Sequence, residues 1–382
     1  MSRRPVAVRR GAVIAVVVSA CLGGSAVSAS DALGKGGVYG CRTGEDRRKA
    51  VLKFGGSEES EAAVEAALRW LARNQEPDGS WAVAKWGGKN AWGRVGVTGL
   101  ATLAFLGAGH TEKTGRYKPF VVKAVRYLIS KQSKQGAIGS GEGHWGYNHA
   151  IAGLALAEAY GMARVRRTGM AASMAVRHAV NIHMYRMGGW RYAPGQKPCT
   201  SVTGWFSMFL SSAKTAGLKV DPKGFSGARA HFDRVAIMPG RGAPEEVGGA
   251  GYTSNERPTA TMTAVAMIAR LRLGQKRTGP LLERGADFLL RNRSEQGPSG
   301  WYLYLHYYGG QAMFQMGGDR WEKWNETMRD TLVREQIDAP GDARIDGSWE
   351  PVSRGGQYGG RVYSTAMACM SLEVYYRYKR VK

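Results

Sequence analysis

The chain has 382 residues, of which 43% are hydrophobic, 22% are charged and 10% are aromatic, and its formal net charge at pH 7 is +24. The hydrophobic fraction excludes a generally disordered chain, and the length suits one large domain or two ordinary ones. The positive charge indicates a surface that attracts anions, although charges scattered over a solvated face would give the same total. Nucleic acid is not the expected partner if the protein is exported; an anionic polysaccharide, lipid head group or wall polymer is.

The first residues are typical of an export signal. Four arginines within the first ten residues precede the apolar run 11–20, which is too short for a permanent membrane anchor. Small residues at 27–29 favour cleavage before Ser30, whereas residues 18–21 also resemble a bacterial lipobox, in which Cys21 would be acylated and kept. We predict a signal peptide over 1–29 and an exported protein of the periplasm, cell envelope or medium, with a lipid anchor at Cys21 as the alternative. No later segment is predicted to span a membrane.

After a Gly-rich, charged lead-in segment over 30–57, one unit recurs six times between residues 58 and 382. Each unit has an amphipathic helix, a Gly-rich turn that ends in an aromatic residue, and a second helix of small and apolar residues. The turns are 75–81, 141–146, 188–192, 248–252, 297–301 and 346–349. The first helices are predicted around Val64 to Leu71 and over 121–128, 175–184, 227–237, 281–291 and 321–336. The second helices are predicted over 97–106, 148–160, 201–216, 258–273, 304–316 and 363–378.

The second helices carry almost no charged face. Such a helix must be surrounded by protein on most sides, and a single helix pair cannot bury its own apolar surface. Neighbouring pairs must therefore stack, and six pairs can close on themselves. The sequence predicts an all-α fold, an (α/α)6 toroid with a solvated outer ring and an inner ring of second helices.

Two of the turns resemble a known repeat. Residues 75–81 read Gln-Glu-Pro-Asp-Gly-Ser-Trp, and residues 346–349 read Asp-Gly-Ser-Trp. This pattern is similar to the prenyltransferase and squalene-oxidase repeat, and the resemblance covers residues 58–382. The chain resembles exported members from planctomycete-type bacteria whose role is poorly defined. The resemblance implies the α/α toroid of terpene cyclases, protein prenyltransferase β subunits and the complement thioester domain, with the turn tryptophan as a packing residue.

The catalytic residues of these relatives are missing. The chain has no Asp-x-Asp-Asp motif, which squalene-hopene cyclases use to protonate an alkene, and no Gly-Cys-Gly-Glu-Gln thioester motif. At the places comparable to the prenyltransferase zinc site, residues 303–308 lack the Asp and the Cys, and Ser364 stands where the His is expected. The sequence therefore predicts no metal and no cofactor. Cys41 and Cys199 lie in loop-like sequence and are candidates for pairing in an oxidising compartment.

In such toroids the N-terminal halves of the inner helices line the central cavity. The predicted catalytic candidates are His149, His306, Tyr307 and Tyr363, with His149 or His306 as a general acid or base and a tyrosine as its partner. Further candidates for the lining are Asn148, Trp205, Thr259, Thr261, Tyr308, Gln311 and Ser364. The alternative is structural, because a His or Tyr near a helix start usually satisfies a neighbouring main-chain group.

Two functions stay open. The first is an exported toroid that binds a ligand or partner in the cell envelope, either an anionic glycan or an apolar chain. The alternative is an enzyme, either terpene cyclase-like or a lyase or hydrolase on an acidic glycan, that uses the cavity His and Tyr residues. A hydrolase needs two carboxylates across a cleft, and the turn-loop acids Asp78, Glu142, Asp346 and Glu350 show no spacing that pairs them.

Overall fold

The computed structural model describes residues 38–89, 93–240, 242–292 and 300–380. The predicted signal peptide over 1–29, Cys21 and the first part of the lead-in segment lie outside these ranges. Within them the chain is helical, with two isolated β-bridges, Gln132 to Ile138 and Ala236 to Ala250.

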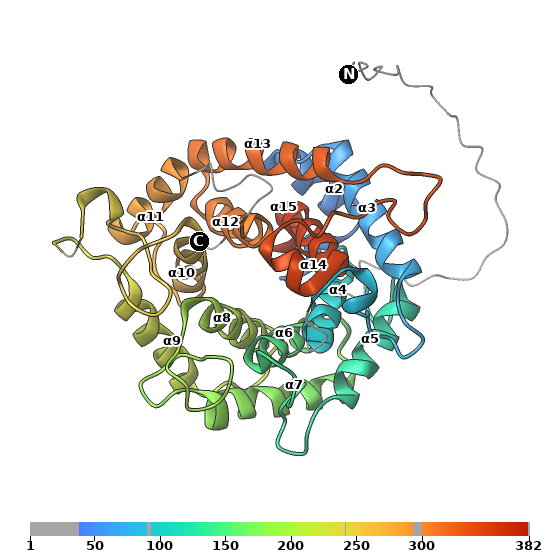
Figure 1. Cartoon of the computed structure of the whole chain (residues 1–382), viewed down its shortest axis with the longest axis horizontal. Helices are drawn as coiled ribbons and strands as arrows, with labels where there is room; N and C mark the ends of the chain where they lie inside the picture. Colours follow the sequence, from blue (N-terminus) through green and yellow to red (C-terminus); the bar gives the residue numbers. More distant parts are fainter. Residues whose placement is uncertain (1–37, 90–92, 241, 293–299, 381–382) are drawn as a thin grey trace.

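Two concentric rings of helices make up the molecule (Figure 1). The outer ring consists of α3 (Glu58–Arg73), α5 (Lys118–Ser130), α7 (Arg166–His178), α9 (Pro222–Val235), α11 (Pro280–Arg291) and α13 (Gly318–Glu335). The inner ring consists of α4 (Arg94–Gly107), α6 (Trp145–Ala163), α8 (Thr200–Thr215), α10 (Ala260–Arg272), α12 (Tyr302–Met316) and α14 (Arg354–Leu372). Each inner helix contacts the next and α14 contacts α4, so the inner ring is closed. The predicted all-α toroid of six helix pairs is confirmed.

The composition of the two rings explains their positions. Helix α3 begins with a capping box between Ser57 and Ser60 and buries one face only. In α4, by contrast, every residue from Val95 to Gly107 is buried. Small residues let the inner helices approach closely: a Cβ added at Gly153 of α6 would lie 2.6 Å from the ring of Phe209 in α8.

Three turn tryptophans hydrogen-bond to the outer helix that precedes them. In three of the six repeats the indole Nε1 donates to a main-chain carbonyl of the preceding outer helix or its continuation, at 2.8 to 2.9 Å. The pairs are Trp81 with Leu71, Trp190 with Ala179 and Trp349 with Leu332. All three tryptophans are fully buried. Their packing role, as the resemblance implied, is confirmed.

A threonine on the inner helix completes the same joint. The main-chain N–H of the turn donates to Oγ1 of this threonine at 3.0 to 3.3 Å in four repeats. The threonines are Thr98, Thr203, Thr263 and Thr365. The buried turn amide is thereby satisfied, as a buried polar group must be.

Several elements differ from the sequence-based prediction. The lead-in segment contains helix α2 (Gly44–Phe54), which contacts the short α15 (Val374–Arg377) that follows α14. Helix α7 starts nine residues before the predicted 175 and continues as a π-helix over Ala179–His183. Helix α14 includes a kink at Gly360, where φ is +70°. The polar, Gly-containing sequences of α2 and early α7 have weak apolar periodicity, and they are ordered by the surfaces on which they pack.

The three cysteines within the described residues, Cys41, Cys199 and Cys369, are free. The expected pairing of Cys41 with Cys199 is therefore wrong. Cys41 lies beside Arg42 at the C-terminal ends of the inner helices, whereas Cys199 precedes α8 at the turn end, so the ring separates them. In the described part of the chain, no helix combines the length and the apolar character needed to cross a bilayer.

Candidate ligand-binding site

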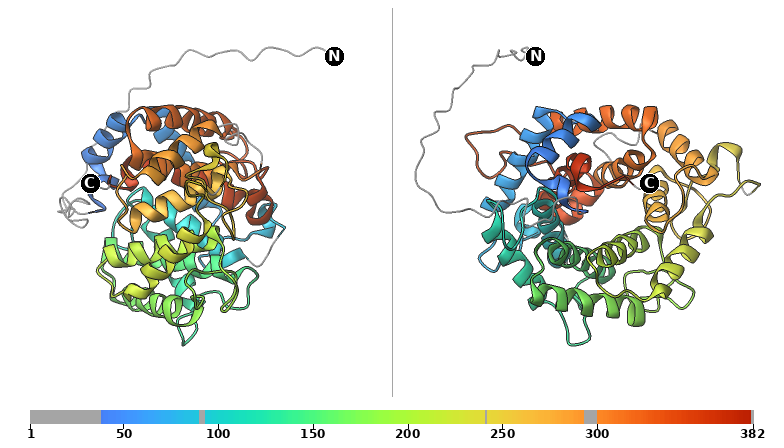
Figure 2. Two further views of the ribbon diagram at one scale, coloured as in Figure 1. Left: turned by 90° about the vertical axis from the view of Figure 1, so that its left-hand side faces the viewer. Right: turned by 180° about the vertical axis from the view of Figure 1, so that it is seen from behind.

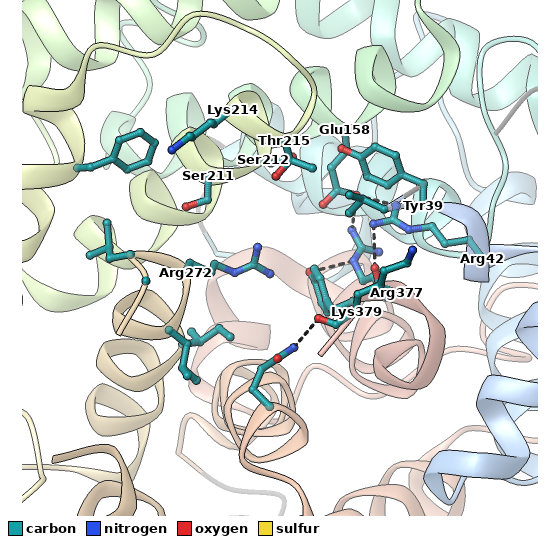
Figure 3. A pocket seen from close by; sticks show the side chains of 18 of the residues that line it. Tyr39, Arg42, Glu158, Ser211, Ser212, Lys214, Thr215, Arg272, Arg377 and Lys379 are labelled. Carbon is teal, nitrogen blue, oxygen red and sulfur yellow. Dashed lines mark hydrogen bonds and ion pairs between the residues drawn. The ribbon is translucent and has the colours of Figure 1, made fainter. Parts of the chain in front are cut away.

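A cavity of about 600 Å³ opens at the C-terminal ends of the inner helices (Figure 3). Its walls come from the C-terminal parts of α6, α8, α10 and α12, from the outer helix α9, from α15 and the residues after it, and from the chain just before α2. Six cationic side chains line it, against one carboxylate, that of Glu158. The cations are Arg42, Lys214, Arg229, Arg272, Arg377 and Lys379. Such a wall concentrates positive potential in a partly enclosed space.

A buried ion cluster forms one side of the cavity. Arg42 and Arg377 place guanidinium nitrogens 2.9 and 3.2 Å from the same Oε2 of Glu158. Arg377 also lies 2.7 Å from Oε2 of Glu373, the fourth member of the cluster. All four side chains are buried, and a Cβ at Gly107 would lie 1.8 Å from Glu373. The absent side chain of Gly107 therefore makes the room in which this pair sits.

The cluster gives its two carboxyl groups different pKa values. Burial by itself raises the pKa of Glu158, but the charges of Arg377 and Arg42 outweigh burial, so this pKa lies below its ordinary value. Burial raises the pKa of Glu373 to about 7, and Arg377 only partly opposes the shift. Glu158 is thus held as a carboxylate between two guanidinium groups and is poorly placed to donate a proton.

Three of the arginines that line the cavity donate hydrogen bonds to main-chain carbonyls at helix ends. Arg42 donates to the carbonyl of Leu106 at 3.1 Å, and Arg377 donates to that of Leu103 at 2.6 Å, both in α4. Arg229 donates to the carbonyl that follows α10, at 2.7 Å. The last carbonyls of a helix lack intrahelical partners and carry partial negative charge, which these guanidinium groups satisfy.

Arg272 is oriented differently, because it reaches from α10 across the cavity (Figure 3). Its Nη2 donates to Oε1 of Gln311 at 3.2 Å, and its guanidinium lies 4.8 Å from the ring centre of Tyr378. Its Nε has no hydrogen-bond partner among the described residues, and neither has the buried Oγ of Ser211 on the facing wall. Arg272 and Ser211 therefore offer hydrogen-bonding capacity that the fold does not use.

Tyr378 connects the cavity to the interior. Its hydroxyl accepts a hydrogen bond from Nε of Arg377 at 3.0 Å and lies 3.4 Å from the hydroxyl of Tyr307. Tyr307 is one of the predicted catalytic residues, and it is buried against Trp205, with ring centres 5.5 Å apart. It thus contacts the site from beneath, through Tyr378.

The predicted catalytic residue His149 lies within the turn joint of the second repeat. Its Nδ1 accepts a hydrogen bond from the amide of Ile138 at 3.1 Å, and its Nε2 lies 3.2 Å from the carbonyl of Ala175. It is the fifth residue of α6, as Thr98 is of α4, and it accepts from the turn amide in the way that Thr98 does. His149 is fully buried, and burial lowers its pKa well below the ordinary value. The geometry supports the structural alternative for this residue.

His306 and Tyr363 occupy comparable buried surroundings at the turn end. His306 is the fifth residue of α12, and its ring centre lies 5.8 Å from that of Tyr302. Tyr363 is half-buried in α14 beneath the preceding segment, where a Cβ at Gly359 would lie 2.5 Å from its Cβ. Among the described contacts, the four predicted catalytic side chains have different neighbours: His149 belongs to the second turn joint, His306 packs on Tyr302, and Tyr307 packs on Trp205.

The cavity therefore lies at the end opposite to the one that the sequence suggested. The N-terminal halves of α8 and α12 are filled by large rings that contact one another, namely Trp205, Tyr304, Tyr307 and Tyr308. At their C-terminal ends these walls have small residues such as Ser211, Ser212 and Gly274. Arg272 and Arg377 lie inside helical sequence and gave no sequence signal of this cavity. The described residues contain no group of three or more His, Cys, Asp or Glu placed to hold a metal ion.

The sequence matches no protein-family model, that of the prenyltransferase repeat included, and no curated protein matches it. Solved structures do match. The GH76A α-1,6-mannanase from Salegentibacter sp. shares 12% identity at a TM-score of 0.54, over 83% of this chain and 99% of that one. Cellobiose 2-epimerase from Spirochaeta thermophila shares 14% identity at a TM-score of 0.56, over 87% and 98%.

A UGL variant with the oligosaccharide dGlcA-Glc-Rha-Glc shares 14% identity at a TM-score of 0.58, over 84% of this chain and all (100%) of that one. At such identities the likeness shows the fold alone. The chain is an α/α toroid over most of its length, a fold that it shares with carbohydrate-active enzymes.

Proposed function

We propose that this protein is an exported toroid that binds the anionic group of a glycan in the cationic cavity at the C-terminal ends of its inner helices. The observation that carries the proposal is the lining of six cations against one carboxylate, which is already paired. The fold's likeness to structures that contain α-1,6-mannotriose or dGlcA-Glc-Rha-Glc supports a carbohydrate ligand. The positive charge of the cavity would contribute nothing to the binding of an uncharged isoprenoid chain.

The lining suits a sugar acid in three respects. A volume of about 600 Å³ lies within the range of small-molecule sites. The unused Nε of Arg272 belongs to a planar fork that can bind a carboxylate or sulfate through two parallel hydrogen bonds. Ser211 and the hydroxyl of Tyr378 stand on the walls for the neutral hydroxyl groups of a sugar.

The test is a titration of the mature protein with a uronate oligosaccharide and a sulfated oligosaccharide, followed by calorimetry at low and high salt. We expect Arg272→Glu to weaken binding at least tenfold and added salt to weaken binding to the unchanged protein. Arg48→Glu is the matched control, because the Arg48 side chain is 76% exposed on α2 and outside the cavity. Equal affinities for the unchanged protein and Arg272→Glu would overturn the proposal.

A second candidate function is a lyase on the same acidic glycan, and the position of Tyr378 favours it. In such an elimination a base takes the proton from the carbon beside the carboxylate, a carbon–carbon double bond forms, and the glycosidic oxygen leaves with a proton. Tyr378, held by Arg377 at 3.0 Å and lying against Arg272, is the proton-exchanging group that we assign to this step, with Arg272 placed to neutralise the sugar carboxylate. Hydrolysis has less support, since it needs two working carboxylates and Glu158 is paired.

One variant distinguishes the binding function from the lyase function. Tyr378→Phe keeps the ring under Arg272 and removes only the hydroxyl. If the protein is a lyase, we expect this variant to bind the glycan within about threefold of the unchanged protein and to form no unsaturated product, which is detected by ultraviolet absorbance. Absence of product from the unchanged protein would leave the binding function and reject the lyase.

Export is part of the proposal and is tested separately. The arginines before residue 11 and the small residues at 27–29 support a cleaved signal, and residues 18–21 support the lipidated alternative. Mass spectrometry of the mature protein distinguishes a free N-terminus at Ser30 from an acylated Cys21. A mature chain that retains Met1 would contradict both.

A further inference from the structure

A group of aromatic side chains lies at the turn end of the toroid, at the opposite ends of the inner helices from the cavity. We name Tyr147, Tyr192 and Tyr252, with His144 and Arg191, the turn-end platform. The rings of Tyr147 and Tyr192 are 5.8 Å apart between centres, and those of His144 and Tyr192 are 4.4 Å apart. The guanidinium of Arg191 lies 4.9 Å from the ring centre of Tyr192 and 5.5 Å from that of Tyr252.

The platform is accessible. Tyr252 is 36% exposed, and Tyr147, Tyr192, His144 and Arg191 are partly exposed. Most large aromatic side chains of this protein are buried in the core, including six fully buried tryptophans. Several adjoining rings that keep contact with solvent therefore stand out from the rest of the molecule, and exposed patches of this kind mark binding surfaces.

The main chain fixes the rings in place. The amide of Gly146 donates to the carbonyl of Tyr192 at 2.8 Å, and the amide of Thr200 donates to that of Tyr252 at 2.8 Å. A Cβ at Gly146 would lie 2.1 Å from the carbonyl of Arg191, so glycine is required for this approach. The hydroxyls of Tyr192 and Tyr252 are hydrogen-bonded at 2.5 Å, which holds the two rings together.

Backbone strain occurs at one position beside these rings. His144 has a φ of +52°, in the left-handed region that non-glycine residues seldom occupy. His144 is the residue before α6, and this conformation places its imidazole against Tyr192. Residues held in such conformations cluster at ligand sites, because the surrounding structure must impose them. The strain is an observation independent of the exposed rings, and it lies at the same place.

We propose that the turn-end platform is a second carbohydrate site, which binds an uncharged sugar ring by stacking. Aromatic faces suit the C–H face of a pyranose, and the phenol hydroxyls at the ring edges suit its hydroxyl groups. Arg191 is the one cation among the five residues of the platform and is stacked on two of its rings, whereas six cations line the cavity. The platform therefore selects a neutral sugar, whereas the cationic cavity selects an acidic one.

The two sites are separate along the same helices. In α8 the hydroxyl of Ser201 is hydrogen-bonded to that of Tyr147, while Ser212 lines the cavity. Eleven residues of α-helix separate these two serines, which corresponds to about 17 Å at 1.5 Å per residue. A glycan bound through a charged unit at one end of the ring does not reach the other end without passing around the molecule, so the sites bind independently.

The test uses α-1,6-mannotriose and cellobiose as neutral probes, titrated into the mature protein and followed by calorimetry and by NMR of the sugar protons. We expect the double variant Tyr192→Ala, Tyr252→Ala to weaken binding at least tenfold. The single variant Tyr252→Phe should remain within about threefold, because the stacking face is kept. Tyr358→Ala is the matched control: Tyr358 is 51% exposed and lies outside the platform, so its removal should have no effect.

Two further results complete the test. Arg272→Glu should leave binding of the neutral probes unchanged, which distinguishes a failure of this inference from a failure of the proposed function. If the double variant loses helical circular dichroism, Tyr252→Ala alone replaces it, since Tyr252 lies in a surface loop. The proposal is overturned if the unchanged protein shows no saturable binding up to about 10 mM of either probe, or if the alanine variants bind as well as Tyr358→Ala.

Discussion

The two ends of the toroid are built on the same six inner helices but differ in packing and charge. At the turn end, buried tryptophan, threonine and histidine side chains satisfy main-chain groups of the turns and outer helices in neutral joints. At the opposite end, arginines satisfy the helix carbonyls and surround a cavity. Viewed from the side and from behind, the paired helices run from one end of the molecule to the other (Figure 2). One end of the ring of helices is therefore closed by apolar joints. The other end contains a cavity, because the charged groups there cannot pack against each other without counterions.

Acid should break the turn end, and we expect this to be the largest effect. Burial lowers the pKa of His149, His178, His183 and His231, to about 4 for His183 and about 3 for His231. Their stabilising contribution is fully present above the unfolded pKa of about 6.5 and is lost as the pH falls towards the folded values, roughly 3 kcal/mol for His183 alone.

Two carboxyls act in the opposite sense. Burial raises the pKa of Glu142 and of Glu373 to about 7, so their contribution is fully present below about pH 4.5 and is lost as the pH rises through 7. Because His110 also has a pKa lowered to about 4, and the lowered pKa of Glu158 likewise makes its contribution disappear in acid, we expect the free energy of unfolding to fall by several kcal/mol between pH 6.5 and 4. Urea titrations across this range measure the change, and a flat profile would contradict the neutral histidine joints.

At the cavity end, Glu158→Gln should destabilise the fold by about 4 kcal/mol, because it leaves Arg42 and Arg377 buried without their shared carboxylate. Glu45→Gln is the matched control, since Glu45 pairs with Arg48 only at the surface and should cost less than about 1 kcal/mol. Thermal and denaturant unfolding of both variants give the comparison. Equal stabilities would mean that the buried cluster does not hold this end together.

His149→Ala should cost about 2 kcal/mol, since the amide of Ile138 loses its acceptor and the ring leaves a void. If His149 is structural, any glycan turnover found should fall only in proportion to the folded fraction. Activity lost at full stability would instead restore its predicted catalytic role. The measurement is kcat beside the free energy of unfolding, at a temperature where the variant is folded.

Thr203→Val should have the smallest effect, about 1 kcal/mol, because it nearly keeps the volume of the side chain and removes only the hydrogen bonds of the hydroxyl with the amide and the carbonyl of Trp190. Ser207→Ala on the same helix is the control, since its hydroxyl bonds within α8 only and belongs to no turn joint. Amide hydrogen exchange at Trp190 should accelerate in Thr203→Val and not in Ser207→Ala.

Local sequence was a good guide to the rings and a poor one to the site. The apolar periodicity of the outer helices and the uncharged inner helices such as α4 are local properties, and they predicted the toroid. His149 and Tyr307 drew attention as polar groups on apolar helices, yet the fold uses the first as a turn acceptor and places the second beneath Tyr378. Arg272 and Arg377 look like ordinary helical arginines until their helices are placed in the ring.

By itself, the sequence determined that six helix pairs form, that the second helix of each pair lies inside and that the turn tryptophans Trp81, Trp190 and Trp349 are packing residues. The apolar period, the small residues and the turn glycines that encode these features act within a few residues of one another. Only the tertiary structure decided which end of the ring is open and which charges meet there. Arg42 reaches the carbonyl of Arg377, 335 residues away, and shares Glu158 with it. Such partners are brought together by closure of the ring, and no pattern along the chain encodes their distance.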